Sequence, residues 1–143
     1  MKKTIIILII LFGVKGFGQK FTCEDLKEGT FKTKTIEPEK IELEIIRKGN
    51  EQIEIIKEIP EKYRDLGYPT DPHYVKIEWI DDCSYRAKYD SSKAELTESQ
   101  KFINSVGGIL TEIIKIEENC FYYKSTMKIG EQEQITEGKM CKE

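Results

Sequence analysis

The chain has 143 residues, with 23 basic and 26 acidic side chains and a formal net charge of −3. This length is typical of one domain. Basic and acidic residues are interspersed along the chain instead of forming blocks. A nucleic-acid or anionic-lipid surface needs clustered Lys and Arg, so the composition argues against both kinds of partner.

The first 18 residues predict a signal peptide, followed by a single mature domain over 19–143. Lys2 and Lys3 precede an apolar run over 4–14, which is shorter than the roughly 20 residues of a membrane-spanning helix. Two glycines then precede Gln19 at the spacing that signal peptidase needs. Removal of the leader leaves 20 basic against 26 acidic residues, a net charge of about −6. The mature chain is therefore expected to be exported, to the periplasm or the cell exterior, without a membrane span.

Two alternatives to a cleaved leader were considered. The apolar run could remain as an uncleaved membrane anchor. Lipidation at Cys23 is a further option, but Phe21 and Thr22 stand where a lipobox needs small or aliphatic residues.

Two short helices are expected, over 22–29 and 97–108. In each segment a Thr is followed three residues later by Asp or Gln, which is the spacing of a capping box. Gly29 and Gly107 provide the stop signals. In the second helix, Phe102, Ile103 and Val106 fall on one side. Between these helices, the proline-rich segment 59–73 predicts an irregular loop that either binds a ligand or covers one end of a sheet.

Most of the remaining apolar residues recur at every second position, the period of a β-strand. The pattern predicts an all-β fold: an antiparallel meander of about eight strands that forms a barrel or a strongly curved sheet. The expected strands are 30–36, 40–48, 51–58, 74–80, 84–90, 108–117, 120–129 and 132–140.

Turn residues and charge pairs set the expected strand registers. Gly49-Asn50 favours a hairpin that pairs Arg47 with Glu51, although isoleucines on both faces leave that register open. Each of the other hairpins also has a specific expected pairing. The expected pairs are Trp79–Tyr85, Ile77–Ala87, Val75–Tyr89 and Glu78–Arg86; Ile116–Phe121, Ile114–Tyr123 and Leu110–Met127; and Lys128–Glu133, Lys124–Glu137 and Cys120–Cys141.

The four cysteines of an exported chain predict two disulfide bonds. Three connectivities are available to four cysteines. The hairpin register favours Cys120–Cys141, which leaves Cys23–Cys83. A zinc site is disfavoured because the chain contains no C-x-x-C motif and a single His, His73.

The segment "WIDDCSYRAKYD" (79–90) contains the densest set of reactive groups. Cys83 as a nucleophile would need a base, for which His73 is the sole histidine, and the acids beside Cys83 disfavour its thiolate. Asp81 and Asp82 are adjacent, so they do not face each other as glycosidase carboxylates do, and they lack the alternation of a calcium loop. We therefore expect a hairpin turn here, with no catalytic residue, metal or cofactor.

Five aromatic residues fall on the expected inner faces of the strands. They are either core residues or the lining of a lumen that holds a small apolar ligand. These candidate ligand-facing residues are Trp79, Tyr85, Tyr89, Phe121 and Tyr123.

Three groups of residues resemble a set of small secreted bacterial β-proteins of unknown function. The groups are Cys23, Gly29 and Phe31; Arg47, Gln52 and Glu54; and Trp79, Asp82, Cys83 and Tyr85. The stretch "LKEGTF" is also similar to the Gly-x-Trp opening of lipocalins, with Phe31 in place of Trp. The sequence thus favours a non-catalytic binding or structural module of the cell envelope, with a protein or a small apolar ligand as partner. A lipocalin-like carrier is the alternative, and a hydrolase is a third reading.

Overall fold

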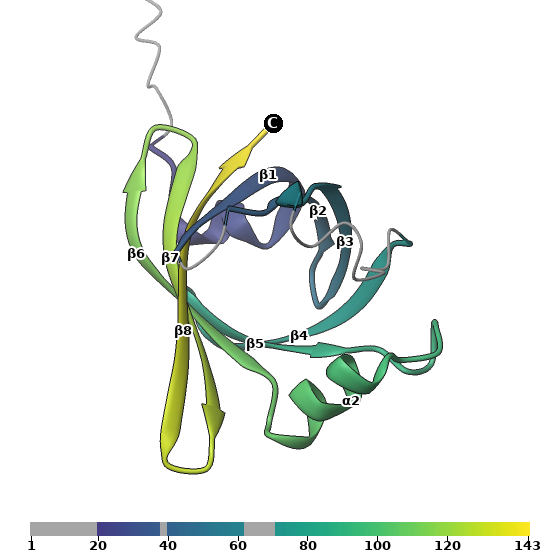
Figure 1. Ribbon diagram of the computed structural model, residues 1–143. Coiled ribbons are helices and arrows are strands. Elements are labelled where there is room, and N and C mark those ends of the chain that lie inside the picture. The colour runs from purple at the N-terminus through teal and green to yellow at the C-terminus, as the bar shows by residue number, and fades with distance from the viewer. Residues whose placement is uncertain (1–19, 38–39, 62–70) are drawn as a thin grey trace, which may run out of the picture.

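A computed structural model describes residues 20–37, 40–61 and 71–143. Within these residues, eight antiparallel strands form one closed barrel in which each strand pairs with its neighbour in the chain and β8 pairs with β1 (Figure 1). The strands are β1 (Glu28–Glu37), β2 (Glu42–Lys48), β3 (Glu51–Glu58), β4 (His73–Asp81), β5 (Ser84–Tyr89), β6 (Ile109–Glu117), β7 (Cys120–Ile129) and β8 (Gln132–Lys142). The all-β prediction is confirmed, and the sheet closes into a barrel. The expected leader and most of the proline-rich segment lie outside the described residues.

The up-and-down topology sorts the connections between the two ends of the barrel. Tight turns follow β2, β4 and β6 at one end, where the 3₁₀ helix η1 (Cys23–Leu26) and the end of β8 also lie. We call this the plugged end. At the other end, called the open end, lie the longer connections, the β7–β8 turn and α2 (Glu98–Ser105) (Figure 1).

The plugged end is filled by packed side chains. Leu26 of η1, Phe31 and Phe121 are fully buried there. The Trp79 and Tyr85 rings pack edge to face with their centroids 5.1 Å apart. Complete burial of one such apolar side chain contributes about 1.5–3 kcal/mol to folding. This half of the barrel therefore provides the hydrophobic core.

The first expected helix is shorter than its sequence pattern suggests. The predicted cap is present, because the Thr22 backbone N–H donates to Asp25 Oδ2 at 2.9 Å. However, η1 ends at Leu26, and β1 already includes Gly29 with φ +131°. A side chain at Gly29 would meet Lys142 Cε at 2.6 Å. Gly29 therefore serves the positive φ at this position, and a side chain there would also displace the end of Lys142.

The second expected helix, α2, is confirmed and is attached to the end of β5. Its capping box is formed, with Gln100 N donating to Thr97 Oγ1 at 3.2 Å. Asn104 donates to the Tyr89 carbonyl and accepts from the Tyr89 N–H, each at 2.9 Å. This orientation points Ile103 toward the barrel interior and leaves Phe102 46% exposed, so the two do not share a buried face.

Two of the expected hairpin registers are confirmed throughout. The β4–β5 ladder pairs Trp79 with Tyr85 and Glu78 with Arg86, and the β7–β8 ladder pairs Cys120 with Cys141. In both hairpins the turn residues and the cross-strand charges favour the same register. Agreement between these independent signals made the register predictable.

The β6–β7 register was only partly predicted. Ile116 faces Phe121 as expected, but Tyr123 pairs with Ile113 instead of Ile114. Leu110 likewise pairs with Thr126 instead of Met127. A β-bulge between Ile113 and Lys115 shifts the ladder by one residue, because it places an extra residue on one strand. Ile114 points outward as a result and is 65% exposed.

The expected β2–β3 register was wrong by one residue. Arg47 pairs with Gln52, Ile45 with Glu54 and Leu43 with Ile56. The paired isoleucines of both strands satisfy either register, so the apolar pattern does not distinguish them. The observed register directs Arg47, Gln52 and Glu54 into the barrel. The polar part of the interior is therefore the part that the hairpin pattern failed to predict.

Candidate functional site

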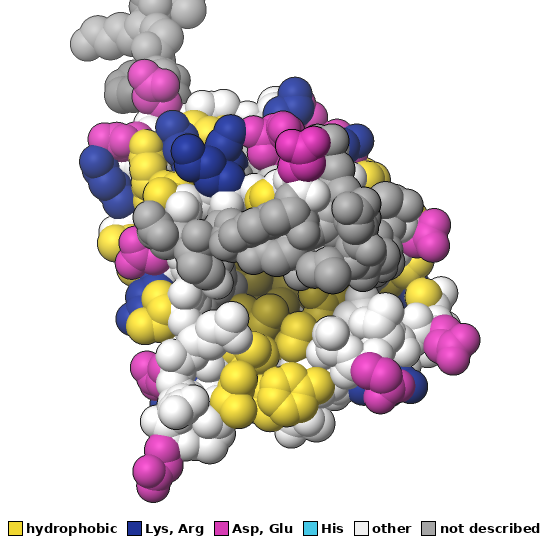
Figure 2. Space-filling view, in the orientation of Figure 1, with side chains coloured by type: hydrophobic (Ala, Val, Ile, Leu, Met, Phe, Trp, Pro, Cys, Tyr) yellow, Lys and Arg dark blue, Asp and Glu magenta, His cyan; other side chains and the backbone are white. Residues whose placement is uncertain are grey.

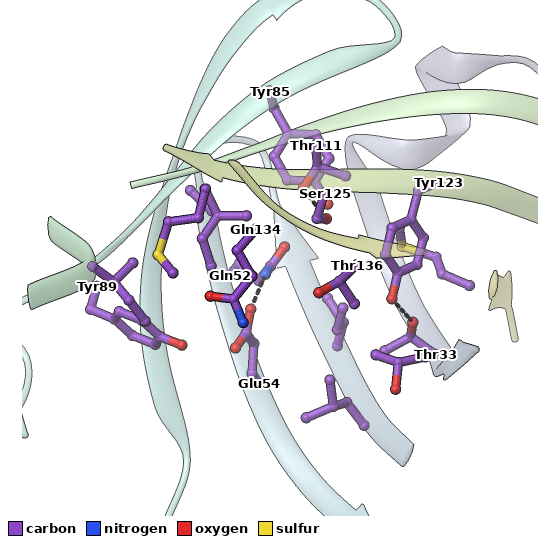
Figure 3. A pocket seen from close by; sticks show the side chains of 18 residues that line it. Thr33, Gln52, Glu54, Tyr85, Tyr89, Thr111, Tyr123, Ser125, Gln134 and Thr136 are labelled. Carbon is purple, nitrogen blue, oxygen red and sulfur yellow. Dashed lines mark hydrogen bonds between the residues drawn. The ribbon is translucent and has the colours of Figure 1, made fainter. Parts of the chain in front are cut away.

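The open half of the barrel encloses a cavity of about 390 Å³ (Figure 3). In the space-filling view, hydrophobic side chains gather in a hollow at the centre of the face that is shown (Figure 2). The cavity lining combines aliphatic, hydroxyl and amide side chains with one carboxyl. The lining residues are Thr33, Thr35, Leu43, Ile45, Gln52, Glu54, Tyr85, Ala87, Tyr89, Ile103, Ile109, Thr111, Tyr123, Ser125, Met127, Gln134, Thr136 and Met140.

Three of the five candidate ligand-facing aromatics contribute to the cavity wall. Tyr85, Tyr89 and Tyr123 line the cavity. Trp79 and Phe121 instead pack in the core of the plugged end. A role in ligand binding stays a prediction for the three tyrosines, whereas the other two are placed as core residues.

Several hydroxyl groups of the cavity wall are paired with one another. Tyr123 Oη lies 3.1 Å from Thr33 Oγ1, and Thr111 Oγ1 lies 2.8 Å from Ser125 Oγ. Burial raises the pKa of Tyr123 to about 12, so its phenol is neutral at physiological pH. The ring lies over Gly138, where an added Cβ would meet Tyr123 Oη at 2.3 Å. These pairs give the wall polarity without charge.

A buried chain of hydrogen bonds connects the core to the cavity. Arg47 is 2% exposed, and its guanidinium donates to the Leu26 carbonyl and to Tyr85 Oη, each at 3.0 Å. It also donates through Nε to Gln52 Oε1 at 2.8 Å. Gln52 in turn donates through Nε2 to Glu54 Oε1 at 2.6 Å (Figure 3). The Arg47 charge thus fixes the orientation of the Gln52 amide, and the amide fixes the carboxyl group of Glu54.

Glu54 is the acidic residue among the described lining residues of the cavity. Burial raises the pKa of its carboxyl, while the hydrogen bond from Gln52 and the charge of Arg47 oppose that shift. The dominant cause is desolvation, which disfavours the ionised form of an acid.

His73 is the strand partner of Glu54 but lines a second cavity of about 310 Å³, which also includes Tyr89 and Asp90. Its ring packs against Tyr89 with the centroids 6.0 Å apart. Burial lowers the pKa of His73, and the charge of Asp71 opposes that shift. Among the described residues, none hydrogen-bonds its buried Nε2 atom.

Asp90, in that second cavity, is strongly acidic. Hydrogen bonds from Ser92 lower the pKa of Asp90 to about 2, and Lys76 Nζ lies 3.0 Å from the carboxylate. Its Oδ1 atom is therefore engaged in holding the turn after β5.

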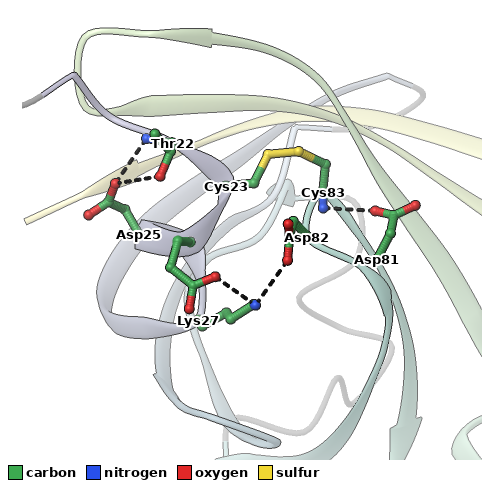
Figure 4. Close-up of a disulfide and its surroundings, with 8 residues drawn as sticks. Thr22, Cys23, Asp25, Lys27, Asp81, Asp82 and Cys83 are labelled. Carbon is green, nitrogen blue, oxygen red and sulfur yellow. Dashed lines mark hydrogen bonds and ion pairs between the residues drawn. A yellow bond between two sulfur atoms is a disulfide. The ribbon is translucent and has the colours of Figure 1, made fainter.

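Cys83 is joined to Cys23 in a disulfide at the plugged end, with their Cα atoms 5.1 Å apart (Figure 4). The neighbouring Asp81 accepts from the Cys83 N–H at 2.8 Å, and Asp82 lies 3.3 Å from Lys27 Nζ. The acid pair thus belongs to a turn, away from the cavity lining. The thiol of Cys83 is consumed by the disulfide bond.

The second disulfide joins Cys120 to Cys141 across β7 and β8, with a Cα–Cα distance of 4.0 Å. Both predicted disulfides are therefore present, and both lie at the plugged end. Two disulfide bonds are compatible with an exported protein.

Sequence reasoning did not place Gln52 and Glu54 in a binding site. The apolar pattern left the β2–β3 register ambiguous, so it did not show which residues of β3 face inward. The available signal was Arg47: a register that buries Arg47 requires polar partners on the same face of β3.

Within the described part of the chain, no three or more His, Cys, Asp or Glu residues gather as a metal site would require. None of the helices described here has the length and apolar character needed to span a membrane.

The fold and the cavity define a small disulfide-bonded β-barrel with a half-filled interior. No known protein family matches the sequence, and no characterised protein or solved structure is detectably similar to it. The chemistry of the cavity is therefore the guide to function.

Proposed function

We propose that this protein is an exported carrier that binds one small, partly apolar molecule in the open half of its barrel. The observation that carries the proposal is the cavity of about 390 Å³ enclosed by the strands. Ligand pockets are typically about 300–1,000 Å³ and mostly apolar, with a few oriented polar groups. Leu43, Ile45 and Ile109 supply apolar wall, and the Gln52–Glu54 pair supplies the oriented polar group.

Division of the barrel into a packed end and a hollow end supports the same function. The core and both disulfides stabilise one end, so the other end is free to leave space unfilled. A cavity lined by aliphatic side chains costs stability relative to a filled core. Retention of this cavity is therefore better explained by a ligand than by the needs of folding. Of the two main readings of the sequence, the hollow interior favours the carrier over a purely structural module.

The test is a titration with prodan, a small neutral dye whose fluorescence changes in apolar surroundings. We expect saturable binding of one dye per protein. The variant Ala87→Phe fills the cavity from β5 and should abolish binding while keeping the barrel folded. Ile114→Phe adds the same ring to the outer face and serves as the matched control. Dye binding that survives in Ala87→Phe, or no dye binding by a folded wild-type protein, would contradict the proposal.

A further inference from the structure

We infer that the bound molecule carries a protonated amino group, which pairs with Glu54, on an otherwise apolar chain or ring. This inference rests on the proposed carrier function and specifies the ligand for it. It depends on the position of Glu54, on the supports that hold its carboxyl and on the distribution of charge around the cavity.

The carboxyl group of Glu54 is held in place by its neighbours. Glu54 extends from the inner face of β3 into the cavity, and its Oε1 atom accepts from Gln52 Nε2 (Figure 3). The oxygen of the same amide is held by Arg47, so the amide cannot turn over without losing both hydrogen bonds. A carboxyl that is fixed by an amide, itself fixed by an arginine, is preorganised to receive a donor from the cavity.

The charged groups around the cavity favour a positively charged ligand. Arg47 does not line the cavity, and its donors reach the Leu26 carbonyl, Gln52 and Tyr85. An anionic ligand would therefore meet the carboxyl group of Glu54 before any positive group of the described wall. A wholly apolar ligand would leave a carboxyl buried against hydrocarbon, which costs free energy. An ammonium group supplies both a donor and the opposite charge, and such charge-assisted bonds are roughly twice as strong as neutral ones.

The remaining lining residues favour an apolar body for the rest of the ligand. Aliphatic side chains line the same cavity as Glu54, among them Leu43, Ile109 and Met127. Tyr85 and Tyr89 add aromatic rings, which attract cations through their faces. The hydroxyl pairs Thr33–Tyr123 and Thr111–Ser125 satisfy each other and make little demand on the ligand. One amino group with an apolar body satisfies this lining.

Proton balance gives the proposal a distinctive signature. Burial raises the pKa of the Glu54 carboxyl, which favours its neutral form in the empty cavity. Ion pairing with an ammonium group requires the carboxylate, so a Glu54 carboxyl that is protonated in the empty cavity loses its proton to solvent when the amine binds. The amine keeps its own proton. Affinity for the amine should therefore rise as the pH rises through the Glu54 pKa.

Other titratable groups around Glu54 must not account for that pH dependence. These groups include the guanidinium of Arg47 on β2 and the phenols of Tyr85 and Tyr89 on β5 and of Tyr123 on β7. His73 of β4 is the strand partner of Glu54, and burial lowers its pKa. The variant His73→Gln removes this second titrating group, and the rise in affinity with pH should persist in it.

The experiment uses displacement of prodan from the full mature protein by octylamine, octan-1-ol and octanoic acid, which share one apolar chain. We expect octylamine to bind about tenfold more tightly than the other two, as one charged hydrogen bond allows. In Glu54→Gln this preference for octylamine over octan-1-ol and octanoic acid should disappear, with each affinity measured relative to the affinity of that variant for prodan. Glu112→Gln removes one negative charge from the exposed face of β6 and should keep the preference.

Proton release is measured by calorimetry of octylamine binding in two buffers with different ionisation enthalpies. The observed heats should differ between the buffers for wild type and agree for Glu54→Gln. Equal binding of all three ligands, or a preference for octanoic acid, would overturn the amine inference and leave the carrier function standing. Failure of prodan to bind the folded wild-type protein would overturn both.

Discussion

At the scale of single residues, the barrel interior contains groups that a purely structural core would avoid. Arg47 is fully buried, and its charge is stabilised by hydrogen bonds and by the Tyr85 ring, whose centroid lies 4.5 Å from the guanidinium carbon. Glu54 lines the cavity, and desolvation raises the pKa of its carboxyl. Residues that reduce stability are expected at functional sites, because selection retains them for a purpose other than folding.

The Glu54→Gln substitution should therefore stabilise the barrel, increasingly so at higher pH. Burial raises the pKa of Glu54 in the folded state above its usual value of 4.5. The folded state then binds more protons than the unfolded state, so wild-type stability falls as the pH rises above that usual value. Gln has no proton to lose, so the gain in unfolding temperature should be larger at about pH 8 than at about pH 4. Thermal unfolding at both pH values measures it; an equal gain at both would count against a raised pKa.

A second prediction at this scale concerns Gly138, which leaves room for the Tyr123 ring. The substitution Gly138→Ala brings the new Cβ to 2.3 Å from Tyr123 Oη, so the ring or β8 must move. We expect a loss of about 1–3 kcal/mol in the free energy of unfolding, typical of overpacking. Urea denaturation measures this loss. In a Tyr123→Ala background the same substitution should cost much less, and an undiminished cost would show that the clash is not its cause.

At the scale of elements, the sequence predicted hairpins where independent signals agreed. In β7–β8, Gly130 begins the turn while Lys124 and Glu137 pair across the strands, and both features require the same register. In β2–β3, adjacent isoleucines on each strand fit two registers, and the burial of Arg47 distinguishes the observed register. The bulge in β6 has no marker in the sequence, since bulges depend on how strands bend to close the barrel. The sequence did not reveal the Glu54 site because the β2–β3 register was ambiguous, and the register determines which residues face inward.

The bulge makes opposite predictions for two adjacent isoleucines of β6. Ile113 packs against the core, whereas Ile114 is 65% exposed. Ile113→Ala should lower the free energy of unfolding by about 1–3 kcal/mol, since it leaves a gap beside Tyr123. Ile114→Ala should change it by less than about 0.5 kcal/mol. Urea denaturation of the two variants measures both values. A larger loss of stability in Ile114→Ala than in Ile113→Ala would support the register expected from the sequence and contradict the bulge.

At the scale of the whole molecule, the barrel separates stability from binding along its axis. The plugged end holds the aromatic core, η1 and both disulfides, while the open end holds the cavity and α2. The Arg47–Gln52–Glu54 chain links the two halves, because it begins at the Leu26 carbonyl in the core and ends in the cavity. A ligand at Glu54 is thus supported by the rigid half of the molecule.

This separation predicts that the two disulfides affect stability and binding differently. In the chain-entropy model, the Cys23–Cys83 bond, with a sequence separation of 60, contributes about 4 kcal/mol. The Cys120–Cys141 bond, with a separation of 21, contributes about 3 kcal/mol. Replacement of Cys23 and Cys83 by Ala should lower the urea midpoint of unfolding more than replacement of Cys120 and Cys141 by Ala.

Prodan titration of the same variants completes the test. The Cys120→Ala/Cys141→Ala protein should keep wild-type affinity, because this bond joins β7 to β8 at the end opposite the cavity. The Cys23→Ala/Cys83→Ala protein should bind more weakly, because loss of this bond frees η1 and with it the Leu26 carbonyl that holds Arg47. Equal affinity in both variants would mean that η1 does not support the cavity through Arg47, and that the two halves of the barrel are independent.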